Sequence, residues 1–295
     1  MPLNFSQIQI DKKPFESEVY DVMVGSGRWE VKVHDQGLVA LLDVMPRFAP
    51  VGKTADFAIV QAARVSYGQG TKLVNEDRGL VRYLARHRHT TPFEMVEFKF
   101  HHVMPIFIAR QWIRHRTANV NEYSARYSVV RDRYYRPTKE NVRQQSTGNR
   151  QGGDIPADDL TAQQFVDWLD EVEQQHRRYD EFVEKGVARE LARIALPVSV
   201  YTEWYWKIDL HNLFHFLSLR MDDHAQQEIR DYANAMFALI QPIVPVAAEA
   251  FLDYNFESLH LSRLEVEAIK TGKPLDTENK RENAEWEAKK KKLGI

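Results

Sequence analysis

The chain has 295 residues, a length that allows one large domain or two small ones. Hydrophobic residues make up 43%, enough for a sizeable core, and the formal net charge of -2 lacks the basic excess typical of nucleic-acid-binding domains. Because the chain contains no cysteine, disulfides, thiolate metal sites and a cysteine nucleophile are all excluded.

The N-terminus, MPLNFSQIQIDKKPF, lacks the apolar core and the leading positive charges of a signal peptide. No run of about 18 apolar residues occurs in the sequence, so we expect no membrane-spanning segment. A cytoplasmic protein without a membrane partner is the expectation.

The N-terminal half predicts a leader followed by alternating strands and helices. Residues 1–34 are expected to be an irregular leader, and the string GLVALLDVMP (37–46) predicts a strand. Apolar residues recur at helical spacing in 54–67 and 76–89, which predicts two helices. The string TTPFE then suggests a capping box made by Thr91 and Glu94, with Pro92 at the first helical position.

Strict alternation marks the next segment. Residues 95–103 predict a half-buried strand whose core face carries Val96, Phe98 and Phe100. Pro105 opens the next predicted helix, whose buried side chains would be Ile106, Ala109 and Ile113. Extended structure is expected to resume at 128–137.

The C-terminal half contains one segment of low complexity. Residues 141–158 are rich in Gln, Asn, Gly and Ser, and we expect a mobile surface insert there. A long helix is predicted over 161–185, with Gly186 ending it. A short helix at 188–197 and an alternating strand at 198–208 follow.

Two amphipathic helices, in 210–220 and 222–240, complete the predicted catalytic domain, which we place at 35–270. Residues 271–295 are polar and charged, and predict a frayed extension or a weak helix. Helices and strands are mixed without a regular βαβ alternation, and neither G-x-G-x-x-G nor a Walker loop occurs. We therefore predict an α+β fold, a single compact domain with an insert and a tail.

The most unusual stretch is RHRTANVNEYSARY, residues 114–127, because it is polar without any aliphatic periodicity. One arginine at the end of the preceding helix would complement the helix dipole. Arg114, His115, Arg116 and then Arg126 exceed what a helix end requires. Since guanidinium groups bind phosphates and carboxylates with two hydrogen bonds, the stretch predicts a site for an anionic small molecule.

The spacing RHR-x7-S, from Arg114 to Ser124, resembles the motif of the flavin-dependent thymidylate synthases. Four further strings resemble that family's blocks, in the family's order, and together they span about residues 54–240: HRHTTPFE, FIARQWIRHR, ARELARIALP and LSLRMDDHAQQEIR. The leader, the insert and the tail lie outside the resemblance.

The resemblance implies a chemistry. Members of the family transfer a methylene group from 5,10-methylenetetrahydrofolate to deoxyuridylate (dUMP) and reduce it with FAD, which NADPH reduces again. The lack of cysteine agrees with this, because the other class of thymidylate synthase attacks the pyrimidine with a cysteine. The resemblance also implies a homotetramer with sites shared between subunits. The near-neutral charge and the missing zinc-site and RNA-binding motifs favour neither a metal nor a nucleic-acid partner.

The resemblance also implies the roles of individual residues. The catalytic residue would be Arg220, whose guanidinium would polarise the uracil ring. The residues expected to bind dUMP are Gln111, Trp112, Ile113, Arg114, Glu122, Tyr123, Ser124, Ala125, Arg126, Arg193 and Arg220. Those expected to contact FAD are His89, Thr91, Arg114, His115, Arg116, Glu122, Asp209, His211 and His215.

The block DLHNLFH departs from the family's pattern, since many members carry asparagine and arginine at the positions of Asp209, His211 and His215. The flavin atoms that these three residues would meet are therefore not implied. His224, in the string H-A-Q, is equally compatible with a place in the site and with a helical surface position.

Other interpretations of the same residues stay open. Arg220 alone would suit a helix end, and Ser124 could act as a nucleophile only with a nearby base, for which His115 is the nearest candidate. The arginine-rich segments 82–88 and 110–136 could bind RNA, with tyrosines of the second segment stacking on bases. A metal hydrolase built on the histidines lacks the expected H-E-x-x-H spacing.

Overall fold

The computed structural model describes residues 9, 11–13, 28–47, 49, 53–65, 77–146 and 152–295. The chain forms two compact units, Met1–Phe251 and Leu252–Ile295. No helix in the described part of the chain is long and apolar enough to cross a membrane.

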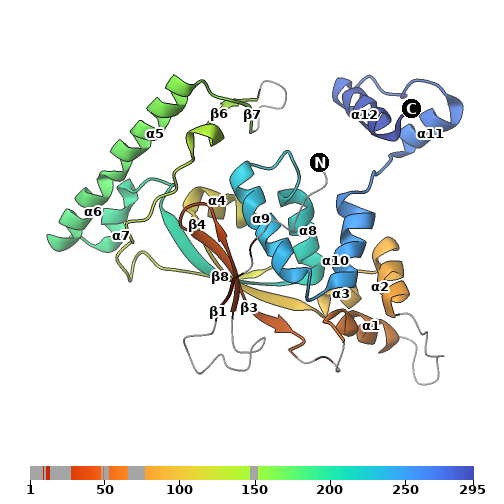
Figure 1. Ribbon diagram of the computed structural model, residues 1–295, viewed down its shortest axis with the longest axis horizontal. Coiled ribbons are helices and arrows are strands. Elements are labelled where there is room, and N and C mark those ends of the chain that lie inside the picture. Colours follow the sequence, from red (N-terminus) through yellow and green to blue (C-terminus); the bar gives the residue numbers. More distant parts are fainter. Residues whose placement is uncertain are drawn as a thin grey trace. The chain divides into compact units, whose positions relative to one another are not determined.

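A six-stranded antiparallel sheet is the centre of the first unit, in the order β1-β2-β3-β4-β8-β5 (Figure 1). The strands are β1 Asp11–Lys13, β2 Arg28–Val33, β3 Gly37–Met45, β4 Glu97–Pro105, β5 Asn119–Glu122 and β8 Tyr201–Asp209. A separate hairpin pairs β6 Arg143–Gln145 with β7 Gly153–Pro156.

Helices accompany this sheet in the first unit, and α8 and α9 lie beside one another against it (Figure 1). The helices are α1 Asp56–Val65, α2 Asp77–Arg86, α3 Thr91–Glu94, α4 Ile106–Trp112, α5 Asp159–Glu173, α6 Gln175–Glu184, α7 Arg189–Ala192, the 3-10 turn η4 Arg193–Ala195, α8 Leu210–Arg220, α9 Gln227–Ile240 and α10 Pro245–Phe251. A further 3-10 turn, η3, covers Lys139–Asn141. Mixed helices and an antiparallel sheet confirm the predicted α+β class.

The core lies where α4, α8 and α9 meet the sheet. Alternate residues of β8 bury their side chains on that face: Thr202, Trp204, Trp206 and Ile208. The indole of Trp112 is fully buried among them, 4.7 Å from the ring of Phe216 and 5.5 Å from that of Trp206. The alternation predicted for β4 and β8 is therefore confirmed.

Three local predictions near the N-terminal half are wrong. Strands β1 and β2 lie within the segment for which an irregular leader was expected. Helix α3 starts at Thr91, and its N-cap, Thr90, makes no side-chain hydrogen bond, so the expected capping box does not form. Helix α4 buries Ile108 and Trp112, whereas Ile113 is exposed.

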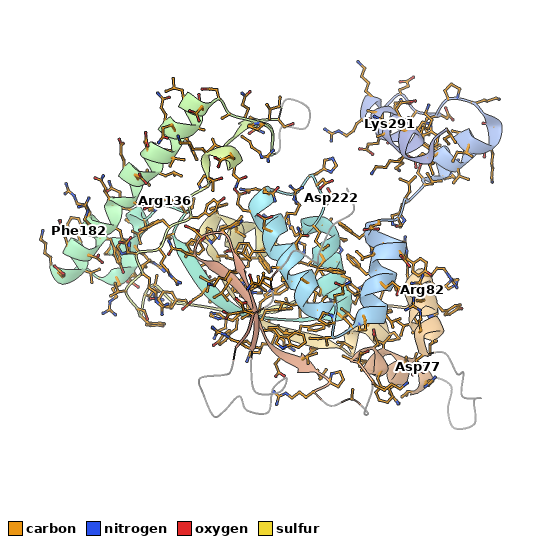
Figure 2. All side chains as sticks on the ribbon, in the orientation of Figure 1. Asp77, Arg82, Arg136, Phe182, Asp222 and Lys291 are labelled. Atoms are coloured by element: carbon orange, nitrogen blue, oxygen red, sulfur yellow. The ribbon has the colours of Figure 1, made fainter. Side chains whose placement is uncertain are left out.

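The long helix predicted for 161–185 is two helices, α5 and α6, separated at Gln174. Gly186 ends α6 as expected, with a φ of +87° and a hydrogen bond from its N–H to the carbonyl of Val183. Several of the apolar side chains on this stretch are exposed, including Trp168 and Phe182 (Figure 2 labels the latter). The insert predicted at 141–158 contains the β6–β7 hairpin, and residues 147–151 lie outside the described part.

The second unit has a small core of its own. Helix α11 (Arg263–Thr271) begins with a capping box between Ser262 and Glu265, and α12 (Lys280–Leu293) begins at the N-cap Asn279. Trp286 of α12 packs with Leu264, Ala268 and Leu275. The C-terminal segment thus contains a capped and packed helix, where a frayed extension or a weak helix was expected.

Candidate active site

The last residue of helix α8 and the turn after α4 meet across 105 residues of sequence. The Nε–H of Arg220 donates to Nε2 of His115 at 3.0 Å, and an Nη2–H of Arg220 lies 3.4 Å from the carbonyl of Gln111. The rings of His115 and His215 stand 6.0 Å apart. We call these four residues, Gln111, His115, His215 and Arg220, the α4–α8 cluster.

The protonation of His115 follows from its partner. A guanidinium can only donate, so Nε2 of His115 must accept, and the proton of the neutral ring must be on Nδ1. Burial, the charge of Arg220 and the neighbouring His215 lower the pKa of His115 from 6.5 to about 4, so the ring is neutral at physiological pH. His115 therefore keeps an Nδ1–H free to donate to another group.

The guanidinium of Arg220 is partly buried, and this desolvation lowers its pKa. Among the described residues, no carboxylate lies within ion-pair distance of it, and its partners, the His115 ring and a carbonyl, are both neutral. Its positive charge is oriented but not neutralised. Such a group favours an anion, or a group on which negative charge develops.

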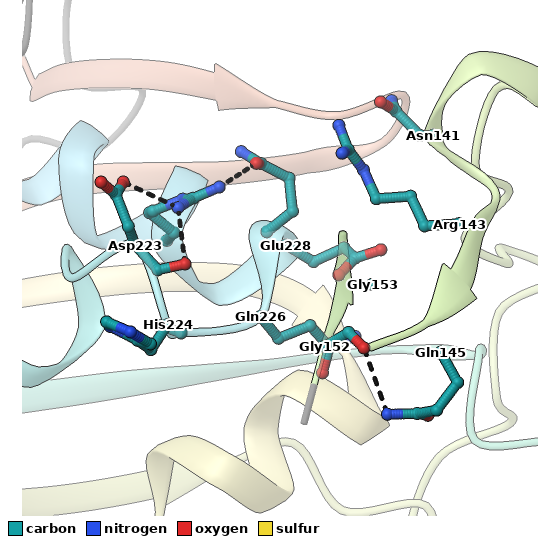
Figure 3. Close-up of a pocket in the computed structure, with 12 residues that line it drawn as sticks. Asn141, Arg143, Gln145, Gly152, Gly153, Asp223, His224, Gln226 and Glu228 are labelled. Atoms are coloured by element: carbon teal, nitrogen blue, oxygen red, sulfur yellow. Dashed lines mark hydrogen bonds and ion pairs between the residues drawn. The ribbon is translucent and has the colours of Figure 1, made fainter. Parts of the chain in front are cut away.

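One flanking contact connects this cluster to a cavity. The side chain of Gln111 donates its amide to the side chain of Gln226, the N-cap of α9. Gln226 in turn lines a cavity of about 500 Å³ between the β6–β7 hairpin and the start of α9 (Figure 3). His224 and Arg143 also line it, and Arg230 is held there by Asp223 and Gln227. Gln226 was not among the predicted site residues, because its role depends on a contact with a residue 115 positions away in the sequence.

A second group of predicted residues forms a turn after strand β5. The N–H groups of Tyr127 and Ser128 both donate to the carbonyl of Ser124, and the N–H of Arg126 lies 3.3 Å from the Ser124 hydroxyl. We call residues 124–128 the Ser124 turn. Arg126 forms an ion pair at 2.8 Å with Glu190 of α7, and Arg193 follows at the start of η4. The turn and the α7–η4 segment are thus neighbours.

Strand β5 itself was not expected, because the segment NVNE carries no apolar alternation and all four of its side chains are exposed. It pairs with β8 at the edge of the sheet. There Glu122 accepts a hydrogen bond of 2.7 Å from the buried hydroxyl of Thr202. Tyr123, predicted as a nucleotide contact, is held by its own hydrogen bonds to Glu203 and Val129.

Two of the predicted flavin residues line a cavity away from the α4–α8 cluster. Arg116 and Asp209 line one cavity of about 280 Å³, together with Asn119 and Lys207. Asp209 is also the N-cap of α8, with its carboxylate on the N–H of Asn212, so its structural role is clear. Among the described residues Arg116 has no carboxylate partner, whereas Lys207 is paired with Glu97.

His89 and Thr91 precede β4. Helix α2 ends at Arg86, and Arg88 follows it with a φ of +57°. The N–H of His89 donates to the carbonyl of Leu84, and the chain then turns into α3. Helix α3 packs against α8, the helix of His211 and His215. No contact between the described side chains joins His89 or Thr91 directly to the α4–α8 cluster.

Some predicted residues do not present a side chain to the site. Trp112 is fully buried in the core, so only its backbone is available to a ligand. Ser124 has no histidine within hydrogen-bond distance in the described part of the chain, and His115 is committed to Arg220. Within the described residues, no group of three or more His, Cys, Asp or Glu is placed to hold a metal ion.

Comparison with known proteins shows the family. Residues 49–246 match the family model described as thymidylate synthase complementing protein. A protein from Dictyostelium discoideum named flavin-dependent thymidylate synthase is 71% identical over 287 residues, which cover 97% of this chain and 95% of the relative. A relative of the same name from Wolbachia pipientis wMel is 51% identical over 242 residues, 82% of each chain.

A solved structure is similar as well. The UMP/dUMP methylase PolB from Streptomyces cacaoi, bound with 5-Br UMP, superposes with a TM-score of 0.66 at 34% identity, covering 76% of this chain and 97% of that one. These similarities lead to one conclusion: the chain belongs to the flavin-dependent thymidylate synthase family.

Proposed function

We propose that this chain catalyses the reductive methylation of dUMP to thymidylate, with 5,10-methylenetetrahydrofolate as the one-carbon donor, FAD as cofactor and NADPH as reductant. The observation that carries the proposal is the oriented but unneutralised guanidinium of Arg220. Beside the uracil ring, it would stabilise negative charge on the carbonyl oxygen or on N3. The ring carbon then becomes a better nucleophile, and no cysteine is needed.

The nucleotide phosphate would lie at the Ser124 turn. A dianionic phosphate needs several donors, and the hydroxyl of Ser124 with the guanidinium groups of Arg126 and Arg193 supplies them. Because Glu190 holds Arg126 in an exposed ion pair, an incoming phosphate can take the place of the carboxylate at little cost. Gln111, kept in place by Gln226, would donate to or accept from the nucleotide.

The donor set also fits FAD. The cavity lined by Arg116 and Asn119 offers a diphosphate an amide and a cation that has no carboxylate partner among the described residues, while its carboxylates, Glu97 and Asp209, are engaged by Lys207 and Asn212. The Nδ1–H of His115 is a donor suited to a flavin ring. When bound, FAD supplies the hydride that reduces the transferred methylene. The protein residues orient the reactants and hold His115 neutral, so that it accepts from Arg220 on one side and donates on the other.

We infer further that the sites are completed in a homotetramer. Exposed apolar side chains occur along α5, α6, α7, η4 and the segment after η4: Phe165, Trp168, Phe182, Leu191, Ile194 and Val198. A patch of this kind on a described surface suits contact with another subunit. The folate and NADPH partners belong to the same proposal, and the cytoplasmic location stays a prediction.

An absorbance spectrum of the purified protein tests the proposal first. Flavin bands should bleach on anaerobic addition of NADPH, and faster when dUMP is present. Addition of 5,10-methylenetetrahydrofolate should then yield thymidylate. A protein that stays colourless after incubation with FAD would overturn the proposal, and RNA binding would be the next property to measure.

A further inference from the structure

Glu122 is an exposed member of the candidate site. It is the last residue of β5, and among the described residues no Lys, Arg or His lies within ion-pair distance of its carboxylate. A single side-chain hydrogen bond reaches it, from Thr202 to Oε1 at 2.7 Å. Its other oxygen, Oε2, is left to accept from a hydroxyl or N–H of a ligand.

The register of the sheet explains why Thr202 reaches it. Glu122 pairs directly with Trp204 of β8, so the two side chains lie on the same face of the sheet. Thr202 is two residues before Trp204 and shares that face, diagonal to Glu122. Trp204 packs there against Trp112, which directly follows Gln111 in helix α4. Glu122 therefore points to the side of the sheet that carries α4.

Thr202 is unusual in its burial. Its side chain is only 6% exposed, on a strand paired on both sides, and a buried hydroxyl must find a partner. The rigid backbone of β8 and the branched side chain leave the hydroxyl little freedom. An exposed carboxylate on an edge strand would otherwise sample several rotamers.

We propose that Thr202 is a positioning residue that fixes the carboxylate of Glu122 for a hydroxyl or N–H group of the bound nucleotide. The inference rests on the proposed function, which assigns Glu122 to the ligand site. Thr202 touches no ligand in this scheme and acts only through Glu122.

The test uses FAD-loaded protein and compares Thr202→Val, which keeps the shape but loses the hydroxyl, with Thr202→Ser, which keeps the hydroxyl. Loss of a hydrogen bond to a charged group should raise the dissociation constant for dUMP about tenfold in the valine variant. The serine variant should bind nearly as the wild type does. Thr271→Val, which removes a hydroxyl that donates to the carbonyl of Glu267, is the matched control and should leave binding unchanged.

A double-mutant cycle with Glu122→Ala separates positioning from a purely structural role. In the Glu122→Ala background, Thr202→Val should cause no further loss of dUMP binding. An equal loss in both backgrounds would mean that Thr202 acts on the fold, and would overturn the inference. Thr202→Ala, with its thermal midpoint measured alongside, replaces the valine variant if that variant does not fold.

The outcomes also separate this inference from the proposed function. Weaker dUMP binding in Glu122→Ala, but normal binding in Thr202→Val, contradicts only the positioning role. Normal dUMP binding, flavin content and turnover in Glu122→Ala contradict the assignment of Glu122 to the site itself.

Discussion

The α4–α8 cluster and the Ser124 turn hold their arginines in opposite ways. Arg220 is partly buried and is oriented by two neutral acceptors, His115 and the carbonyl of Gln111. Arg126 is mostly exposed and is paired with the carboxylate of Glu190. The guanidinium of Arg220 has a fixed orientation, and no carboxylate among the described residues neutralises its charge. The charge of Arg126 is balanced by Glu190, a partner that a ligand can replace.

This difference matches the two tasks proposed for them. A group that stabilises charge developing on a ring must already be in place when the reaction occurs, because reorganisation would raise the barrier. A group that binds a phosphate must be accessible to solvent before binding, and must then exchange its carboxylate partner for the phosphate. Predictions that separate these tasks follow, from the largest expected effect to the smallest.

The largest effect is expected for Arg220→Ala, which removes the oriented charge. Turnover should fall by about three orders of magnitude, while most of the bound flavin is retained. Steady-state thymidylate formation and the flavin spectrum measure the two quantities. Arg281→Ala, in the second unit, is the matched control. Loss of flavin with turnover preserved would show that Arg220 serves the cofactor and not the ring.

Ser124→Ala should have a smaller effect, confined to binding. Loss of one hydroxyl donor should weaken dUMP binding roughly fivefold, and turnover should recover at saturating dUMP. Titration of dUMP against the initial rate gives both values. Normal binding with no turnover would instead revive Ser124 as a nucleophile.

The state of His115 should appear in the pH dependence of stability. Its pKa is lowered to about 4 in the folded protein, so between that pH and 6.5 the unfolded chain binds more protons than the folded one. Folding stability therefore falls as the pH drops through this window, and the contribution of His115 is constant above it. His115→Gln keeps an acceptor for Arg220 but does not titrate.

Urea unfolding at about pH 7 and about pH 5 provides the measurement for both proteins. The wild type should lose more stability than His115→Gln between these two conditions. Identical losses would show that His115 does not carry the perturbed pKa, and that the Arg220 contact does not depend on a neutral ring.

The smallest effect is expected for Glu190→Gln, which removes the negative charge competing for Arg126. Because exposed ion pairs contribute little, dUMP binding should tighten only about twofold, and less at high salt. Calorimetric titration at two ionic strengths tests this. Weaker binding would mean that Glu190 supports the turn and does not compete with the phosphate.

The sequence could predict the parts of the fold that depend on periodicity. The alternation in β4 and β8 and the apolar spacing in α1 and α2 correspond to the observed elements. It could not predict β5, because a polar edge strand gains its stability from pairing with β8 and carries no pattern of its own. The prediction of a capping box at Thr91 was wrong for a related reason. Helix α3 is only one turn long, and it is stabilised by packing against α1 and α8.

The candidate site could be predicted as a set of residue types but not as an arrangement. Arg114 to Arg126 stood out by composition and spacing, whereas the contact of Arg220 with His115 joins elements 105 residues apart. Thr202 and Gln226 were missed altogether, since a buried threonine in a strand and a glutamine before a helix are ordinary residues. Trp112 was selected by its position in a motif, although its side chain belongs to the core.

The buried aromatic cluster behind the site has an optical consequence. Trp112, Trp204 and Trp206 are three of the six tryptophans in the chain, and they pack together with Phe216, whose ring lies 4.8 Å from that of His115. Their emission should be that of indoles shielded from water. An isoalloxazine bound near His115 would accept their excitation energy, so tryptophan fluorescence should report how much of the protein carries its cofactor.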